Sequence, residues 1–274
     1  PPPPPLFFPT QPRYSPILSG LVGSEMCIRD SYGTSRDIPS IEGTSKLSPY
    51  IKHGQIHVGS IWKKCSEIKS KGIGYRKYIN ELGWREFSHS LINYFPEFLK
   101  GNFRKEFDKF PWVKNEKFLK AWKRGMTGYP IVDAGMRELY ETGWMHNRVR
   151  MIVASYLTKH LLIDWRHGLN WFADCLIDWD PASNALGWQW VAGSGPDASP
   201  FFRVFNPELQ SKKFDPKGVY TSKFLKVKSP DSDYTVVIFD KCDTVVKDPV
   251  TGSTIALPTG GKAKILGEIL EELE

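Results

Sequence analysis

The sequence predicts an all-α fold over most of its length. Apolar residues recur at helical spacing between about residues 60 and 180, and no stretch between these helices alternates apolar with polar residues as a half-buried strand would. Of the 274 residues, 41% are hydrophobic and 24% are charged, which is ordinary for a globular protein and excludes disorder throughout. We therefore expect a helical domain over residues 32–220, between an unstructured leader and an atypical C-terminal tail.

Residues 1–31 form the expected leader. The segment opens with five prolines, and proline this dense excludes a helix. It also lacks the basic start and the cleavage pattern of a secretory signal. Residues 24–31 (SEMCIRDS) resemble a translated sequencing adapter, so we expect this leader not to be native protein.

Charge, cysteine content and hydropathy limit the class of protein. The chain carries 37 basic and 30 acidic side chains, and this net charge of +7 suits a polyanionic partner and a solvated basic surface equally well. The four cysteines form no Cys-x-x-Cys motif, which argues against a zinc site and a disulfide framework. No run of about 18 apolar residues could span a membrane. We expect a cytoplasmic protein, or a nuclear or organellar one in a eukaryote.

Residues 43–49 (GTSKLSP) have the chemistry of a phosphate-binding loop. Three hydroxyls and one lysine follow a glycine, which lets the backbone approach a ligand closely. Hydroxyls and backbone N–H groups are suitable donors to phosphates. The alternative is a helix N-cap, in which a serine or threonine side chain accepts a backbone hydrogen bond.

A long amphipathic helix is predicted from Tyr75 to Phe98. Its broad apolar stripe follows i, i+3, i+4, i+7 spacing and consists of Trp84, Phe87, Ser88, Leu91, Ile92 and Phe95. Glu81 and Arg85 stand four residues apart, where they would form an exposed ion pair worth about 0.3 to 0.5 kcal/mol. Alternatively, Glu81, Trp84 and Arg85 form one wall of a binding cavity.

Shorter helices follow along the chain. One ends near Trp122, and the next begins at Ile131, because Pro130 is tolerated in a first helical turn, where its missing N–H costs nothing. Thr142 and Gly143 end that helix. After residue 147, five apolar residues between 149 and 157 fall at helical spacing, so the polar residues 147, 148 and 150 lie at its start or on its other faces.

The stretch from Gly143 to Trp190 combines many indoles with acids, amides and arginines. This mixture suits a flat aromatic ligand, because ligand pockets are mostly apolar with a few placed donors and acceptors. We assign some of the tryptophans to ordinary core packing, namely Trp122, Trp144, Trp171 and Trp179.

Five segments carry a resemblance to a known family. They are residues 44–48 (TSKLS), 81–87 (ELGWREF), 127–133 (TGYPIVD), 143–151 (GWMHNRVRM) and 187–190 (GWQW). In order and spacing they resemble the FAD-binding domain of the DNA photolyase and cryptochrome family, most closely the class I enzymes that repair cyclobutane pyrimidine dimers. The asparagines at 147 and 184 agree, because enzymes for the (6-4) photoproduct have histidine at the first position and plant cryptochromes have an acid at the second.

The resemblance implies a helical domain that binds FAD, folded on itself, at the bottom of a cavity open to DNA. The cofactor's phosphates and sugars would be held by Tyr32, Thr44, Ser45, Lys46, Leu47, Ser48 and Tyr78. The flavin ring would be surrounded by Asn147, Arg150, Asp178, Asp180 and Asn184. Asn184 would also have a catalytic role, since it would face the flavin nitrogen whose protonation state controls electron transfer.

A DNA surface is implied as well. Substrate contacts fall on Glu81, Trp84, Arg85, Asn147, Arg148, Met151 and Trp190, with Arg36 and Gln210 nearer the DNA backbone. The residue types agree, because a pyrimidine dimer cannot be reached inside a duplex and must be flipped out against indole and thioether surfaces. Arg148 suits a flanking phosphate, a contact without sequence preference. We expect UV-damaged DNA as the partner, no membrane association, and a monomer.

The implied activity is light-driven repair of cyclobutane pyrimidine dimers, a carbon–carbon lyase reaction in which reduced FAD carries the chemistry. Trp112, Trp165 and Trp188 match the family's electron-transfer tryptophans. Neither a metal nor an acid–base triad is required. Two alternatives stay open: a cryptochrome-like blue-light receptor that binds FAD without repair, and a helical DNA-binding scaffold without cofactor.

The chain departs from the family pattern at both ends. The family's N-terminal α/β domain, which holds an antenna chromophore, has no counterpart here, so no antenna chromophore is expected. Residues 221–274 lack the family's last helices and receive no function; within them we predict a strand at 234–239 and a helix at 263–273. Gly260, Gly261 and Lys262 resemble a phosphate loop, but Ala263 replaces its hydroxyl residue and the upstream glycine spacing fails.

Overall fold

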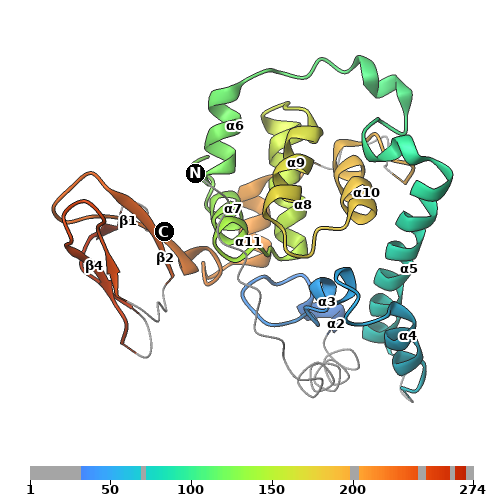
Figure 1. Cartoon of the computed structure of the whole chain (residues 1–274), viewed down its shortest axis with the longest axis horizontal. Coiled ribbons are helices and arrows are strands. Elements are labelled where there is room, and N and C mark those ends of the chain that lie inside the picture. Colours follow the sequence, from blue (N-terminus) through green and yellow to red (C-terminus); the bar gives the residue numbers. More distant parts are fainter. Residues whose placement is uncertain (1–31, 69–71, 198–203, 240–244, 260–262, 270–274) are drawn as a thin grey trace.

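Helices and strands occupy separate segments of the chain. The computed structural model describes residues 32–68, 72–197, 204–239, 245–259 and 263–269. Within these residues, every α-helix lies before residue 215 and every strand lies after residue 223. Figure 1 displays the helices gathered in one body, with the strands in a smaller unit beside it. The all-α prediction is confirmed for the helical segment, and the predicted leader lies outside the described residues.

The helical body follows the order of the sequence. Its α-helices are α2 (Tyr32–Ser35), α3 (Ser48–Lys52), α4 (Val58–Ser66), α5 (Ile73–Tyr94), α6 (Glu116–Lys123), α7 (Pro130–Thr142), α8 (Asn147–Ser155), α9 (Trp165–Cys175), α10 (Pro181–Ala192) and α11 (Pro207–Phe214). Short 3₁₀ turns lie at Pro96–Leu99, Lys105–Lys109 and Thr221–Lys223, and a π-helical turn at Tyr156–His160 extends α8. The predicted long helix ends early, at Tyr94, because Pro96 has no N–H to continue the helical ladder.

The core of the helical body lies where α7 packs against α8. α7 begins at Pro130 and ends at Gly143, whose φ of 68° is a left-handed conformation that glycine adopts readily. Gly135 sits at the contact between the two helices, and a Cβ there would come within 2.3 Å of a Val149 methyl group. Only a residue without a side chain therefore allows α7 and α8 to approach this closely.

Helix α10 lies against α5 and α8, and this arrangement positions the candidate site (Figure 1). The helix begins after Asp180, whose carboxylate accepts the Ser183 N–H at 2.8 Å. Its far side meets α9, where Gly168 leaves room for the Trp188 indole: a Cβ at Gly168 would come within 2.1 Å of that ring. The contact fixes how far α10 stands from α9.

The tail forms two small antiparallel sheets. Their strands are β1 (Phe224–Lys228), β2 (Thr235–Phe239), β3 (Val246–Lys247), β4 (Thr254–Leu257), β5 (Lys264–Ile265) and β6 (Glu268–Ile269). The strand orders are β2-β1-β6 and β3-β4-β5. Ile238, Ile255 and Ala256 are buried between the strands and form a core of their own. No helix in the described residues is long and apolar enough to cross a membrane.

Of the two secondary-structure predictions made for the tail, one is confirmed and the other is wrong. The strand predicted at 234–239 is confirmed by β2. The helix predicted at 263–273 is wrong, because in its described part residues 264–265 and 268–269 pair as strands. Ile265 and Ile269 pack against the small core around Ile238, and this burial prevails over local helix propensity. Gly260, Gly261 and Lys262 lie outside the described residues.

The tail is joined to the helical body by buried polar contacts. The Tyr220 hydroxyl, which is fully enclosed, donates to Glu138 Oε2 on α7 at 2.5 Å. Asp215 accepts the N–H groups of Tyr220 and Thr221 at 2.9 Å each. Burial raises the pKa of Glu138 to about 7, although the hydrogen bond from Tyr220 opposes that rise.

Replacing Gly135 with alanine should destabilise the fold. The new methyl group would overlap Val149, and overpacking of this kind typically costs about 1 to 3 kcal/mol. The matched control is Gly83→Ala on α5, where a Cβ meets nothing within 4 Å and helix propensity should add about 0.5 to 1 kcal/mol. Urea unfolding midpoints measure both changes. Equal midpoints for the two variants would contradict the close approach of α7 and α8.

Glu138 should make stability fall as pH rises. Its folded pKa of about 7 lies above its ordinary value of 4.5, so the folded state holds this proton more tightly. The stabilisation is present below about pH 4.5 and is lost as pH rises through about 7. Glu138→Gln should reduce the pH dependence of the free energy of unfolding between about pH 5 and 7. Glu97→Gln, at an exposed position, should leave that dependence unchanged.

Candidate functional site

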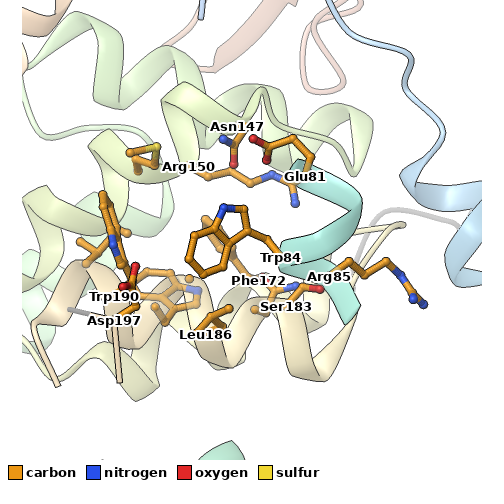
Figure 2. Close-up of a pocket in the computed structure, with 16 residues that line it drawn as sticks. Glu81, Trp84, Arg85, Asn147, Arg150, Phe172, Ser183, Leu186, Trp190 and Asp197 are labelled. Atoms are coloured by element: carbon orange, nitrogen blue, oxygen red, sulfur yellow. The ribbon is translucent and has the colours of Figure 1, made fainter. Parts of the chain in front are cut away.

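A cavity of about 500 Å³ opens between α5, α8 and α10. Pockets of this size hold small-molecule ligands and cofactors. Figure 2 displays the Trp84 ring in the hollow opposite Leu186 and Trp190, while the end of the Arg85 side chain points away. The lining residues are Glu81, Trp84, Arg85, Asn147, Arg150, Met151, Ala154, Phe172, Ser183, Asn184, Leu186, Gly187, Trp188, Trp190, Val191 and Asp197.

Helix α5 supplies one wall of this cavity. Glu81, Trp84 and Arg85 fall on neighbouring positions of the helix and all line the hollow, as the cavity-wall alternative requires. The alternative ion pair between Glu81 and Arg85 is not formed. Glu81 pairs with Arg36 instead, and Arg85 Nη1 contacts Glu86 at 2.8 Å. The reason is tertiary, because α2 packs against α5 and brings Arg36 to Glu81.

A buried ion pair joins the cavity to the start of α3. Arg150 Nη2 lies 3.0 Å from each carboxylate oxygen of Asp178, and Ser48 Oγ donates to Asp178 Oδ2 at 2.6 Å. The Asp178 side chain is 4% exposed, so its charge depends on these partners. Arg150 Nε also donates to the Met145 carbonyl at 2.8 Å. Residues 48, 150 and 178 therefore meet, as the sequence predicts for one cofactor site.

The N-terminus of α10 carries a second polar group. Asp180 caps the helix and lies 3.1 Å from His89 Nε2 on α5, while Asn184 Nδ2 donates to the Asp180 carbonyl at 3.1 Å. Burial alone would raise the pKa of Asp180, but the Ser183 hydrogen bonds and the nearby cations lower it below its ordinary value. Asp180 is therefore an anion beside the cavity, and Asn184 offers a neutral amide within it.

The residues expected at the cofactor's phosphates and sugars lie outside the cavity lining. Tyr32 and Tyr78 pack edge to face at 5.3 Å, and the Tyr78 hydroxyl lies 3.5 Å from Ser45 Oγ. Burial raises the pKa of Tyr32 to about 12, so this hydroxyl stays neutral and can donate. Leu47 is 4% exposed and fixes the loop against this pair in one apolar cluster.

The loop itself presents its polar residues at the surface. Lys46 has a φ of 50°, contacts Glu42 at 2.6 Å and lies 5.5 Å above the Trp144 ring. Thr44 is half-buried, and Ser48 bonds to Asp178. The alternative of a serine or threonine N-cap is wrong, because Leu47 occupies the cap position of α3 and makes no side-chain cap bond.

Three further residues expected at DNA lie outside the cavity lining. Arg148 Nη2 donates to Asp37 at 2.8 Å, and its guanidinium lies 4.4 Å from the centre of the Phe214 ring. Gln210 on α11 is half-buried, and its Oε1 has no partner among the described residues. Arg36 is held by Glu81. Arg36, Arg148 and Gln210 are absent from the cavity lining, whereas Asn147, Met151 and Trp190 belong to it.

The tryptophans expected to carry electrons occupy different depths. Trp188 is 3% exposed and lines the cavity, and Trp165 is fully buried with its Nε1 donating to Asn102 at 2.9 Å. Trp112 is half-buried. In the part of the chain that the structure describes, no ring contact joins the three directly; Trp188 instead contacts Phe172 at 5.0 Å and Trp122 at 6.3 Å.

The tryptophans assigned to core packing have mixed positions. Trp122 is fully buried, as predicted, and its Nε1 donates to the Val153 carbonyl at 3.0 Å. Trp171 and Trp179 are half-buried at the edge of the core, and their Nε1 atoms lack partners among the described residues. Trp144 is half-buried beneath Lys46. None of these four lines the cavity.

Sequence reasoning missed several lining and supporting residues. Ser183, Gly187 and Val191 follow i, i+4, i+8 spacing on α10, so helical periodicity from Asn184 and Trp188 could have found them. His146 gave no signal of this kind. It caps α8 by accepting the Arg148 N–H at 3.2 Å, and burial lowers its pKa to about 4, so the imidazole is neutral.

The comparison with known families decides the identity of this fold. A family model described as the FAD binding domain of DNA photolyase matches residues 78–237, more than half of the chain. The chain belongs to this photolyase family. A second family model, described as ribosomal protein S27, matches residues 220–274, the segment that received no function from its sequence.

Individual photolyases and a cryptochrome are similar to the helical segment. The deoxyribodipyrimidine photo-lyase of Agrobacterium fabrum is 54% identical over 198 residues, which cover 71% of this chain and 41% of that protein. A crystal structure of a bacterial class III photolyase from Agrobacterium tumefaciens has a TM-score of 0.71 and 51% identity over 76% of this chain and 43% of that one. A Synechocystis cryptochrome structure has a TM-score of 0.70 and 35% identity, over 76% of this chain and 44% of that one.

The chain thus spans less than half the length of these relatives. The expected class I assignment stays a prediction, since one similar structure is of class III.

The cofactor of this photolyase domain is FAD, and the cavity fits part of it. The lining surface is mostly apolar, which suits a flat ring, and Asn147 and Asn184 offer neutral amides there. The side chain of Asn147 makes no hydrogen bond within the described structure, so its donors and acceptor are available to a ligand. Tyr78, Ser45 and Ser48 extend the polar surface beyond the Arg150 and Asp178 pair, where the cofactor's phosphates would lie.

Breaking the buried ion pair should weaken the fold and the site together. Asp178→Asn leaves Arg150 without its anion, and loss of one partner of a buried pair costs about 3 to 5 kcal/mol. We expect the low end of that range, because the Arg150 side chain is 20% exposed. The control Asp174→Asn removes the same charge from an exposed position on α9. Urea unfolding and flavin absorbance per chain measure both effects; unchanged flavin content in Asp178→Asn would contradict the assignment.

Proposed function

We propose that the chain carries out light-driven repair of cyclobutane pyrimidine dimers in DNA. The observation that carries this proposal is that a single cavity is lined by residues expected at the flavin ring and by residues expected at the dimer. Asn147, Arg150 and Asn184 belong to the first group, and Trp84 and Trp190 to the second. A donor and an acceptor held in one hollow are close enough for direct electron exchange.

The residues of the chain position the lesion in this mechanism. The indoles of Trp84 and Trp190 provide flat apolar surfaces for two unstacked pyrimidines, and Met151 on α8 adds a thioether surface. Glu81 and Asn147 can hydrogen-bond the base edges, since both line the hollow. Arg85, at the mouth of the cavity, can neutralise the DNA backbone.

The remaining polar groups hold the cofactor and set its electrostatics. The chemistry supplied by bound, reduced FAD is light-driven donation of one electron, which returns after the cyclobutane ring opens. Arg150 would offer a positive charge to the bound flavin, and Asp178 offsets the cost of burying that charge. Asn184 would offer the cofactor an amide that can donate or accept a hydrogen bond, since it lines the cavity. No proton transfer by an acid–base triad is needed.

The buried tryptophans supply electrons from the surface. Trp188 lines the cavity, Trp165 lies in the core and Trp112 is partly accessible, so the three differ in depth, as an electron path from solvent to the site requires. We also infer a monomeric, cytoplasmic protein whose partner is UV-damaged DNA. The repair activity is inferred from relatives of which this chain covers less than half, so it is proposed for the segment that carries the cavity.

A decisive experiment uses the purified chain and a short duplex with one thymine dimer. The yellow absorbance of bound FAD should be present, and reversal of the dimer should require blue light and a reduced flavin. Flavin photoreduction without dimer reversal would favour the second candidate, a cryptochrome-like photoreceptor, which the 35% identity to the Synechocystis cryptochrome supports. A colourless protein that binds DNA would favour the scaffold alternative.

The proposed electron path makes a separate prediction. Trp188→Phe should slow photoreduction of oxidised flavin by at least tenfold in the presence of an external thiol, because phenylalanine is far harder to oxidise. Trp171→Phe is the control, since Trp171 lies on α9, outside the cavity lining, and stacks with Tyr140 at 6.5 Å. Flash spectroscopy detects tryptophan radicals directly. Radicals that persist undiminished in Trp188→Phe would rule this path out.

A further inference from the structure

Four charged side chains form a continuous series of ion pairs beside the cavity. Glu81 on α5 pairs with Arg36 through a short contact to Nη1. The Arg36 Nε lies 3.9 Å from Asp37 Oδ1, and that same oxygen accepts a hydrogen bond from Arg148 Nη2 at 2.8 Å. One acid, Asp37, is therefore shared between two arginines.

The two ends of this series reach different parts of the proposed DNA surface. Glu81 lines the cavity, where a flipped-out dimer would lie. Arg148 is the second residue of α8, outside the cavity lining, where a flanking phosphate would lie. Arg36 and Asp37 follow α2, which packs against α5. The ion pairs thus connect the dimer pocket with a phosphate-binding arginine.

Arg148 is oriented by its neighbours but remains able to take another anion. Its guanidinium lies over Phe214, and its buried Nε has no partner among the described residues. The carboxylate that holds it belongs to Asp37, whose side chain is 34% exposed. A DNA phosphate and Asp37 are both anions that bind guanidinium N–H groups, so they compete for the same cation.

Exchange of partners can keep each arginine paired throughout. Arg36 and Arg148 side chains are each only 17% exposed, so leaving either one without an anion is costly. If Glu81 leaves Arg36, the nearest carboxylate is Asp37, at 3.9 Å. Both arginines approach the same oxygen, Asp37 Oδ1, so a closer contact between Arg36 and this oxygen competes with its hydrogen bond from Arg148. A change at the cavity wall is therefore transmitted to Arg148.

We propose that Asp37 is a specificity-determining residue that restrains Arg148 until a pyrimidine dimer engages Glu81. When Glu81 turns to the base edges of a bound dimer, Arg36 takes up Asp37, and Arg148 is released to the phosphate beside the lesion. Undamaged DNA leaves Glu81 on Arg36, so Asp37 stays on Arg148 and affinity stays low. This role deepens the proposed repair function and rests on it.

The test is Asp37→Asn, with binding measured in the dark to a short undamaged duplex and to the same duplex with one thymine dimer. We expect severalfold tighter binding to the undamaged duplex, because Arg148 is free to contact phosphate. The slope of the logarithm of the association constant against the logarithm of the salt concentration should steepen by about 0.9, the value for one added phosphate contact. Binding to the dimer duplex should keep its slope, since Arg148 is already released there.

Two further variants separate this role from a general effect of charge. Asp174→Asn removes one negative charge from an exposed position on α9 and should leave both slopes unchanged. Combining Asp37→Asn with Arg148→Met should abolish the gain, because Arg148 is the cation that Asp37 restrains. Far-UV circular dichroism and flavin absorbance verify that each variant folds.

Three results would overturn the proposal. They are undamaged-duplex binding by Asp37→Asn no tighter than wild type, an equal gain in Asp174→Asn, and a gain that survives in the Arg148→Met background. Failure of the proposed function has a different signature. A wild-type chain that does not prefer the dimer duplex would contradict the repair function itself, whatever the result for Asp37→Asn.

Discussion

The site depends on the buried pair between Arg150 and Asp178. Asp178 is almost fully enclosed, and a carboxylate in that position needs charged and hydrogen-bonding partners to offset its lost hydration. Arg150 comes from α8, and Ser48 is the first residue of α3, 130 residues before Asp178. Satisfying one charge therefore fixes the start of α3, α8 and the segment before α10 relative to one another. The amides at the cavity and the hydroxyls near it share one site because of this constraint.

Close helix packing carries the constraint to the cavity walls. At Gly135 the gap between α7 and α8 has no space even for a Cβ atom, and at Gly168 the same is true of the gap between α9 and the Trp188 indole. Side chains in such contacts cannot shift without moving a whole helix, since protein interiors are packed at crystal-like density. The cavity lining from α8 and α10 is consequently rigid. The side chains that have room to change position lie at the rim of the cavity, where Glu81, Arg36 and Asp37 are partly open to water.

Local sequence pattern was sufficient for the helices but not for the sheets or the ion pairs. Pro130 and Gly143 mark the ends of α7 directly, because proline suits a first turn and glycine a left-handed end. The two-residue strands near Ile265 gain their burial from partners elsewhere in the tail, so periodicity in their own segment carries no signal. Motif resemblance named most cavity residues. It could not pair Glu81 with Arg36, 45 residues away, since that contact arises from the packing of α2 on α5.

The exposure of Trp84 has a practical consequence for anyone measuring this protein. Its indole is 46% open to solvent at the edge of an apolar hollow, with Phe87 edge to face beside it. A rim of this kind takes up flat, hydrophobic dyes as readily as nucleobases, because stacking on an aromatic face is tolerant of the partner's identity. Displacement assays built on intercalating stains would then count dye captured by the polypeptide as dye lost from the duplex. Covalently labelled oligonucleotides avoid that artefact.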